Sequence, residues 1–125
     1  MEHALNWFEI PVADMDRAIR FYETASGGKL RREAFGGPGQ ELAVFPVKDE
    51  AAVKGALLRA PQARPSDQGA IVYLNAAPAI DAWLERAQRA GGKVLLGKTA
   101  LPDGMGFFAH VLDTEGNRVG IHSLA

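Results

Sequence analysis

The stretch FEIPVADMDRAIRFY (residues 8–22) decides the fold, because in it a strand pattern passes directly into a helix pattern. Its first part predicts a strand over residues 5–12 that ends near Pro11, since proline cannot donate to a sheet ladder. Asp14 then stands where a helix N-cap belongs. Apolar residues recur after it at helical spacing, which predicts a helix that ends near Ala25.

Strand and turn patterns fill the rest of the first half. Two strands are predicted over residues 29–35 and 41–47, with a glycine-rich turn at residues 36–39 between them. A further strand is predicted over residues 53–59. Residues 60–69 hold two prolines and no apolar periodicity, so we interpret them as a connector.

The second half repeats this order of elements. A strand over residues 70–75 precedes a helix with Pro78 in its first turn and Trp83 on its apolar face. Three more strands follow, over residues 93–99, 105–112 and 118–123.

The two halves also share sequence. Gly27-Gly28-Lys29 follows the first helix and Gly91-Gly92-Lys93 follows the second, which is an offset of 64 residues. Such a period is typical of a duplicated module and too long for a solenoid repeat. We therefore predict an α+β fold: a single domain over residues 1–125, made of two tandem βαβββ modules over about 5–59 and about 70–123. The modules are expected to form a partial barrel, with the helices on its convex side and a ligand cavity on its concave side.

Composition excludes several classes of function. The chain has 125 residues, a formal charge of −1 and no cysteine, so disulfides, thiolate nucleophiles and cysteine-based zinc sites are excluded. Without a basic excess, nucleic acid is not an expected partner. No apolar run approaches the roughly 20 residues that span a bilayer. We therefore expect a cytoplasmic protein without membrane association. Exposed strand edges suggest a homodimer, and the alternative is a monomer whose two halves close one cavity.

Two motifs carry a resemblance to a known family. The segment from Phe8 to Tyr22, with its Val-x-Asp and its helix carrying Phe-Tyr, resembles the opening of vicinal-oxygen-chelate proteins of the glyoxalase, bleomycin-resistance and dioxygenase type. The segment from Phe108 to Gly120 resembles the family's second signature, in which Asp-Pro-Asp-Gly-Asn precedes the last strand; here Thr114 and Glu115 replace Pro and Asp. The resemblance is greatest to predicted enzymes related to lactoylglutathione lyase.

Active members of that family hold a divalent metal with four His, Glu or Gln side chains. Carried over position by position, these ligands fall on Trp7, on Gly55 or Ala56, on Ala70 and on Gly120. None of these side chains offers the imidazole, carboxylate or thiolate donor that such metals require. The resemblance together with these residues therefore predicts neither a bound metal nor another cofactor.

Strand alternation identifies the side chains expected to line the cavity in the first and last strands. Because successive side chains point to opposite faces, Trp7 and Glu9 should share the cavity face. By the same argument Gly120 places Arg118 and His122 on that face.

In the strand that opens the second half, Ala70, Val72 and Leu74 are expected to line the cavity. Ile71 and Tyr73 are expected to pack against the helix.

Glu9 and His122 are the candidate catalytic residues, because a carboxylate beside an imidazole can orient it and raise its basicity. The alternative is that Glu9 is a half-exposed strand carboxylate and His122 a surface residue. His110, within an apolar strand, is interpreted as a packed and hydrogen-bonded histidine.

Three functions follow from this reading. The first is a small-molecule binder or metal-free enzyme of this family, with the reaction undefined. The second is a non-catalytic protein that sequesters an antibiotic. The third is a metal-dependent lyase, isomerase or dioxygenase whose ligands lie at other positions than those identified above.

Overall fold

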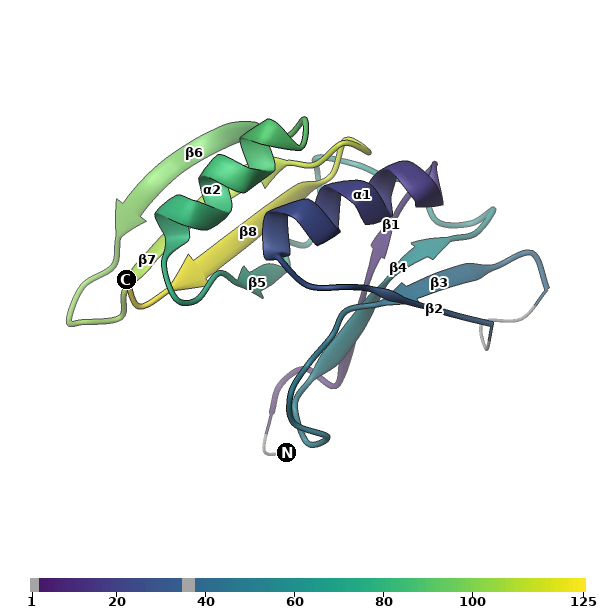
Figure 1. Ribbon diagram of the computed structural model, residues 1–125, viewed down its shortest axis with the longest axis horizontal. Coiled ribbons are helices and arrows are strands. Elements are labelled where there is room, and N and C mark those ends of the chain that lie inside the picture. Colours follow the sequence, from purple (N-terminus) through teal and green to yellow (C-terminus); the bar gives the residue numbers. More distant parts are fainter. Residues whose placement is uncertain (1–2, 35–37) are drawn as a thin grey trace.

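The computed structural model describes residues 3–34 and 38–125 (Figure 1). The first module contains β1 (Trp7–Pro11), α1 (Met15–Ser26), β2 (Arg31–Glu33), β3 (Glu41–Val44) and β4 (Lys54–Arg59). The second contains β5 (Tyr73–Asn75), α2 (Ile80–Arg89), β6 (Lys93–Ala100), β7 (Phe107–Leu112) and β8 (Arg118–Ser123).

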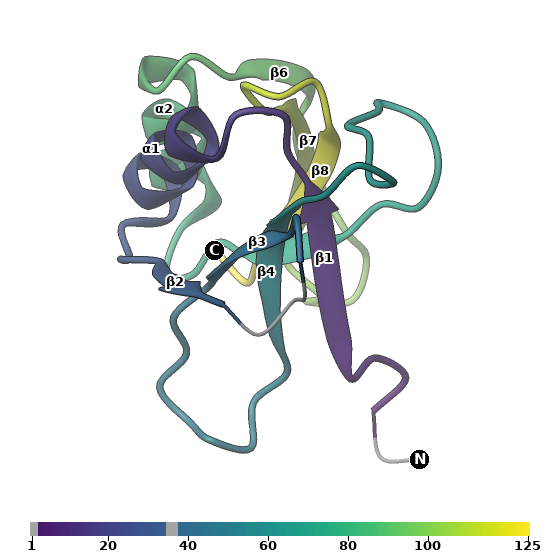
Figure 2. The same cartoon turned by 90° about the vertical axis from the view of Figure 1, so that its right-hand side faces the viewer.

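Each module forms one open four-stranded sheet. The strand orders are β1-β4-β3-β2 and β5-β8-β7-β6. In each sheet the module's first strand along the chain pairs in parallel with its last, β1 with β4 and β5 with β8. The two helices pack side by side and cover one face of the sheets (Figures 1 and 2). The predicted two-module α+β fold is therefore confirmed. Neither helix in the described part of the chain is long and apolar enough to cross a membrane.

Helix α1 begins and ends where the sequence predicts. The Asp14 carboxylate accepts a hydrogen bond from the Arg17 backbone N–H at 3.0 Å, which satisfies one of the unpaired donors of the first turn. Gly27 ends the helix at φ 79°, in the left-handed region that glycine adopts at low cost. Between these caps, Met15 and Tyr22 belong to the apolar face that is buried in the main core.

Helix α2 begins later than predicted. Its N-cap is Ala79, in an extended conformation, so Pro78 precedes the helix and does not lie in its first turn. The physical reason is the position of Ile80, which is fully buried and opens the apolar face. The Ile80 N–H donates to the Ala125 carbonyl at 3.0 Å, so the backbone that follows β8 supplies an acceptor at the start of the helix.

Several strands are shorter than their sequence patterns; the strand predicted over residues 41–47, for example, is observed as Glu41–Val44. The strand predicted over residues 70–75 is reduced to Tyr73–Asn75, because residues 70–72 continue the exposed connector and the Val72 carbonyl alone joins the ladder, by accepting from the Gly120 N–H. The strand predicted over residues 29–35 is observed as Arg31–Glu33. Residues 35–37, which include part of the predicted glycine-rich turn, lie outside the described residues.

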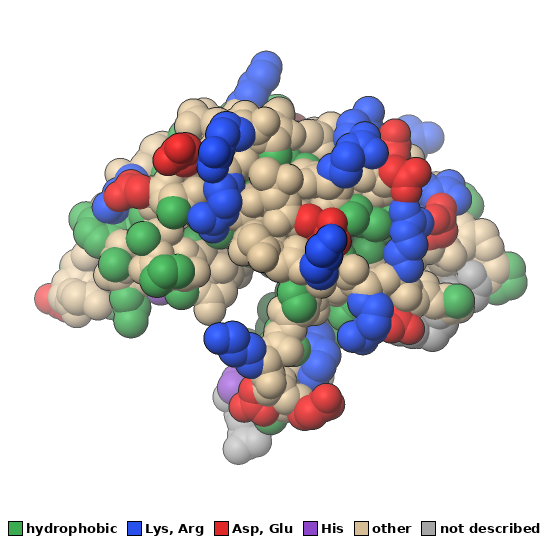
Figure 3. Space-filling model, in the orientation of Figure 1, with side chains coloured by type: hydrophobic (Ala, Val, Ile, Leu, Met, Phe, Trp, Pro, Cys, Tyr) green, Lys and Arg blue, Asp and Glu red, His purple; other side chains and the backbone are tan. Residues whose placement is uncertain are grey.

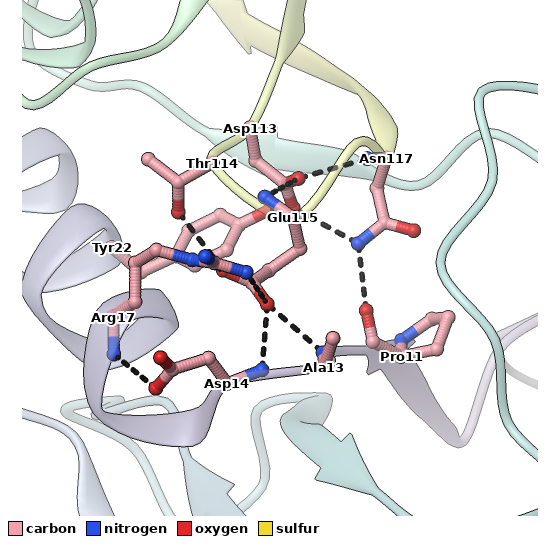
Figure 4. A network of polar contacts seen from close by, with 9 residues as sticks. All are labelled: Pro11, Ala13, Asp14, Arg17, Tyr22, Asp113, Thr114, Glu115 and Asn117. Atoms are coloured by element: carbon pink, nitrogen blue, oxygen red, sulfur yellow. Dashed lines mark hydrogen bonds and ion pairs between the residues drawn. The ribbon is translucent and has the colours of Figure 1, made fainter.

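The loop between β7 and β8 fastens the second module to the first (Figure 4). The Glu115 carboxylate accepts hydrogen bonds from the backbone N–H groups of Ala13 and Asp14 at 2.9 and 2.8 Å, and pairs with Arg17 at 2.6 Å. Although burial alone would raise the pKa of Glu115, these hydrogen bonds and the Arg17 charge lower it overall. Glu115 is therefore an anion at the N-terminus of α1, where the helix dipole favours negative charge.

Two further side chains of this loop complete the fastening. The buried Tyr22 hydroxyl donates to the Asp113 carboxylate at 2.6 Å, and burial followed by the Asp113 charge raises the pKa of Tyr22 well above its ordinary value. The Asn117 amide donates to the Pro11 carbonyl at 2.7 Å and accepts from the Ser66 N–H at 3.0 Å. The family-like Asp-Thr-Glu-Gly-Asn turn thus sets how the two modules sit against each other.

The internal repeat keeps its register in the pairing of each module's first and last strands, whereas equivalent partners on β3 and β7 are 66 residues apart. An offset of 64 residues carries the bounds of β4 onto those of β8, and carries the β1–β4 pair Glu9 and Ala56 onto the β5–β8 pair Tyr73 and Gly120. Equivalent cross-strand pairs of the two sheets, called rungs below, can therefore be compared residue by residue.

Candidate functional site

The face of the first sheet that points away from the helices is filled by its own side chains. Alternation along β3 and β4 places two cross-strand pairs there, Leu42 with Leu58 and Val44 with Ala56. All four are buried, with at most 8 % of their surface exposed, and Trp7 packs against them. This concave face is therefore a second hydrophobic cluster rather than an open site.

The same rungs of the second sheet carry different chemistry. Across β7 and β8, Phe108 pairs with His122 and His110 pairs with Gly120, where the first sheet has aliphatic pairs. The rings of Phe108, His110 and His122 are only partly buried. Tyr73 joins them from β5, with 49 % of its surface exposed. Two aromatic rings and two imidazoles thus occupy a concave face that, among the residues described, no aliphatic cluster fills.

A hollow of about 890 Å³ opens at the end of this second sheet. Its lining is mostly apolar and includes Tyr73, Pro78, Leu101, Phe108, His122 and Leu124. Figure 3 shows hydrophobic side chains gathered around this end of the molecule, near the C-terminus. A cavity of this size with few polar groups is typical of a site for a small organic molecule.

A chain of three polar side chains crosses the concave face beside the hollow. An Arg118 guanidinium nitrogen lies 3.0 Å from His110 Nδ1, and His110 Nε2 lies 2.7 Å from the Tyr73 hydroxyl. Burial lowers the pKa of His110, and the positive charge of Arg118 lowers it further. His110 is thus neutral at physiological pH, in keeping with a packed and hydrogen-bonded histidine.

A second, smaller hollow of about 120 Å³ lies between β1, the connector and the start of β8. It brings together four residues that the sequence analysis placed at a cavity: Glu9, Ala70, Val72 and Arg118. Trp7 lies on the same face as Glu9, as alternation predicts, and the Trp7 indole donates to the Glu9 carboxylate at 3.1 Å.

Glu9 and His122 are not brought together as an acid–base pair. Glu9 lines the small hollow, whereas His122 lines the large one and donates from Nε2 to the Met105 carbonyl at 2.7 Å. The reason is topological, because β5 is the strand hydrogen-bonded to β8. Tyr73 of β5 therefore stands in the second sheet where Glu9 stands in the first.

The prediction that Ile71 and Tyr73 pack against the helix is wrong, because both side chains are exposed and Tyr73 lies on the concave face. Leu74 lines the large hollow and also packs against the main core. The register with β8 sets Tyr73 opposite Gly120, where a side-chain Cβ would approach the tyrosine ring to 2.4 Å. The absent side chain makes room for the ring. Extending the 64-residue offset from Glu9 to Tyr73 would have given the correct face from sequence.

The residues at the expected metal-ligand positions do not fit a divalent ion. On β4 the concave face carries Ala56, whereas Gly55 lies under the Phe8 ring on the opposite face. The counterpart of Trp7 by the offset is Ile71, next to Ala70. Indole, alkyl and hydrogen side chains offer no ligand atoms. Across residues 3–34 and 38–125, no group of three His, Asp or Glu side chains is placed to hold an ion.

Comparison with known proteins places this geometry in a family. The family model for the Glyoxalase/Bleomycin resistance protein/Dioxygenase superfamily matches residues 4–121. None of the curated protein sequences compared with the chain matches it.

Solved structures share the fold at low identity. A V278E mutant of glyoxalase I from Zea mays is 23 % identical with a TM-score of 0.71; the match covers 94 % of this chain and 45 % of that one, so this chain spans about half the length of the maize protein. The antibiotic binding protein TnmS3 from Streptomyces sp. CB03234 is 24 % identical with a TM-score of 0.65, over 97 % and 95 % of the two chains. An E126Q mutant of the fosfomycin resistance protein FosX from Listeria monocytogenes, solved with Mn(II), is 13 % identical with a TM-score of 0.64, over 98 % and 91 %. With its family match over nearly the whole length and its two βαβββ modules, the chain belongs to the Glyoxalase/Bleomycin resistance protein/Dioxygenase superfamily.

Proposed function

We propose that this protein binds a small, largely apolar organic molecule on the concave face of its second module, without a divalent metal. The observation that carries the proposal is the difference between equivalent rungs of the two sheets. Leu42, Val44 and Leu58 fill the first concave face, whereas Phe108 and His122 line an open hollow on the second. Apolar lining with a few polar groups suits a ligand that buries most of its surface and is oriented by one or two hydrogen bonds.

Binding without turnover is the form of this function that the site favours. The candidate acid and base, Glu9 and His122, line different hollows and each has another partner. The similarity in fold to an antibiotic binding protein agrees with a role in sequestering a compound. A metal-dependent lyase, isomerase or dioxygenase activity is disfavoured because Trp7, Ala56 and Gly120, at the positions where the resemblance predicts ligands, cannot coordinate an ion through their side chains.

Titration with the fluorescent probe 8-anilinonaphthalene-1-sulfonate tests the binding site. We expect saturable binding to the wild type, and a loss of roughly tenfold or more in affinity for Phe108→Ala, which removes an aromatic wall of the hollow. Leu95→Ala is the matched control, because Leu95 is also a partly exposed apolar residue of the second sheet but does not line the hollow. Equal weakening in both variants, or no saturable binding, would contradict the proposal.

Calorimetric titration with Ni²⁺, Zn²⁺ and Mn²⁺ tests the metal-free part of the proposal. We expect no stoichiometric binding, and no turnover of the hemithioacetal of methylglyoxal and glutathione after any of these ions is added. One tightly bound ion per chain, with activity that depends on it, would favour the metal-dependent alternative instead.

A further inference from the structure

We propose that the Tyr73 hydroxyl is a hydrogen-bond donor to the ligand, which we infer to be an apolar molecule carrying a carbonyl or ether oxygen. Arg118 and His110 act as positioning residues that fix the direction of this hydrogen bond. The inference rests on the proposed function, because it names the polar group by which a ligand of the large hollow is recognised.

The first step is the contact between Arg118 and His110. A guanidinium carries only donors and has no acceptor, so it can hydrogen-bond to an imidazole nitrogen only if that nitrogen offers a lone pair. The distance of 3.0 Å from the Arg118 nitrogen to His110 Nδ1 is a hydrogen-bond distance. His110 Nδ1 must therefore be unprotonated, since a proton there would face the N–H of Arg118.

The second step follows from the chemistry of a neutral imidazole, which carries one proton on its two nitrogens. With Nδ1 accepting from Arg118, the proton of His110 lies on Nε2. This N–H points at the Tyr73 hydroxyl oxygen, 2.7 Å away, so the hydroxyl accepts. The hydrogen of the phenol is not used in this contact. The lowered pKa of His110 keeps the ring in the neutral state that this arrangement requires.

The third step is the position of Tyr73. The residue lines the large hollow, its ring rests over Gly120, and the Phe108 ring lies with its centroid 6.3 Å away. Within the described ranges, His110 is the only hydrogen-bond partner of the Tyr73 hydroxyl. Its O–H therefore has no acceptor among the described residues, and we infer that it is offered to a molecule in the hollow. A donor beside an apolar lining selects a ligand with an acceptor oxygen next to an apolar body.

Nuclear magnetic resonance of ¹⁵N-labelled protein tests the direction of the hydrogen bonds. Long-range ¹H–¹⁵N correlation at neutral pH reports which nitrogen of each histidine is protonated, and His110→Gln assigns the signal. We expect His110 to be in the Nε2–H form. Arg118→Met should raise the population of the Nδ1–H form, whereas Arg64→Met, which removes an arginine from the small hollow that Arg118 also lines, should leave the spectrum of His110 unchanged. An Nδ1–H form in the wild type would overturn the inference.

Two probes of nearly equal size test recognition of the acceptor oxygen. Tyr73→Phe should weaken binding of 2-acetylnaphthalene by roughly threefold to tenfold and change binding of 2-ethylnaphthalene by less than about twofold, since only the first can accept a hydrogen bond. Equal effects on both probes would overturn this inference and leave the proposed function standing. Failure of both probes to bind the wild type would overturn both proposals.

Discussion

The two concave faces show what a duplicated module can do with one backbone. On the first, aliphatic pairs close over one another and contribute to stability. On the second, the equivalent rungs carry Phe108 with His122 and His110 with Gly120. A buried aliphatic pair stabilises the folded state, whereas a partly exposed ring and imidazole contribute little to it. Under the proposed function, the first module serves mainly as scaffold and the second presents the ligand site.

The largest effect on stability is expected for a variant that removes the contacts by which the β7–β8 loop joins the two modules. Asp113→Ala would leave the buried Tyr22 hydroxyl without its acceptor, and would also remove the acceptor of the Glu115 and Asn117 N–H groups. We expect a loss of about 3 kcal/mol or more in the free energy of unfolding, measured in urea. Asp67→Ala, at an exposed carboxylate in the connector, is the control and should change it by less than about 0.5 kcal/mol. A loss of unfolding free energy as small in Asp113→Ala as in Asp67→Ala would show that the contacts of Asp113 are not needed for stability.

The next effect sets one face directly against the other. Leu58→Ala should lower the free energy of unfolding by about 2–3 kcal/mol, because it opens a cavity in the cluster of the first face. The equivalent change on the second face, His122→Ala, should cost less than about 1 kcal/mol. Binding of 8-anilinonaphthalene-1-sulfonate should show the opposite order, with His122→Ala weakened and Leu58→Ala unaffected. Were the two variants to respond alike in both measurements, the division of roles would be wrong.

The smallest effect concerns pH. The pKa of His110 is lower in the folded than in the unfolded protein, so between the two values the unfolded state binds more protons. The stability contributed by neutral His110 is therefore lost as pH falls from about 6.5 through the folded pKa. Unfolding measured between about pH 7 and pH 5 should show a shallower dependence on pH in His110→Gln than in the wild type. An unchanged dependence would contradict the assigned environment of His110.

The sequence predicted most of the fold because its signals are local or periodic. The Asp14 cap and the Gly27 terminus of α1 depend on neighbouring residues, and the 64-residue repeat needs only a comparison of the two halves. The prediction was wrong at Pro78 and Tyr73, where a distant segment decides. The Ala125 carbonyl meets the start of α2, and Gly120 makes room for the tyrosine ring.

By itself, the sequence determined the two βαβββ modules and the family, because periodicity, caps and residue identity are properties of the chain. Only the tertiary structure decided which side chains meet. It separated Glu9 from His122, joined Tyr73 through His110 to Arg118, and placed the Glu115 carboxylate beside the N-terminus of α1 in the other module. Such contacts depend on which strands become neighbours and on where a missing side chain leaves space, and neither is written in the local pattern of residues.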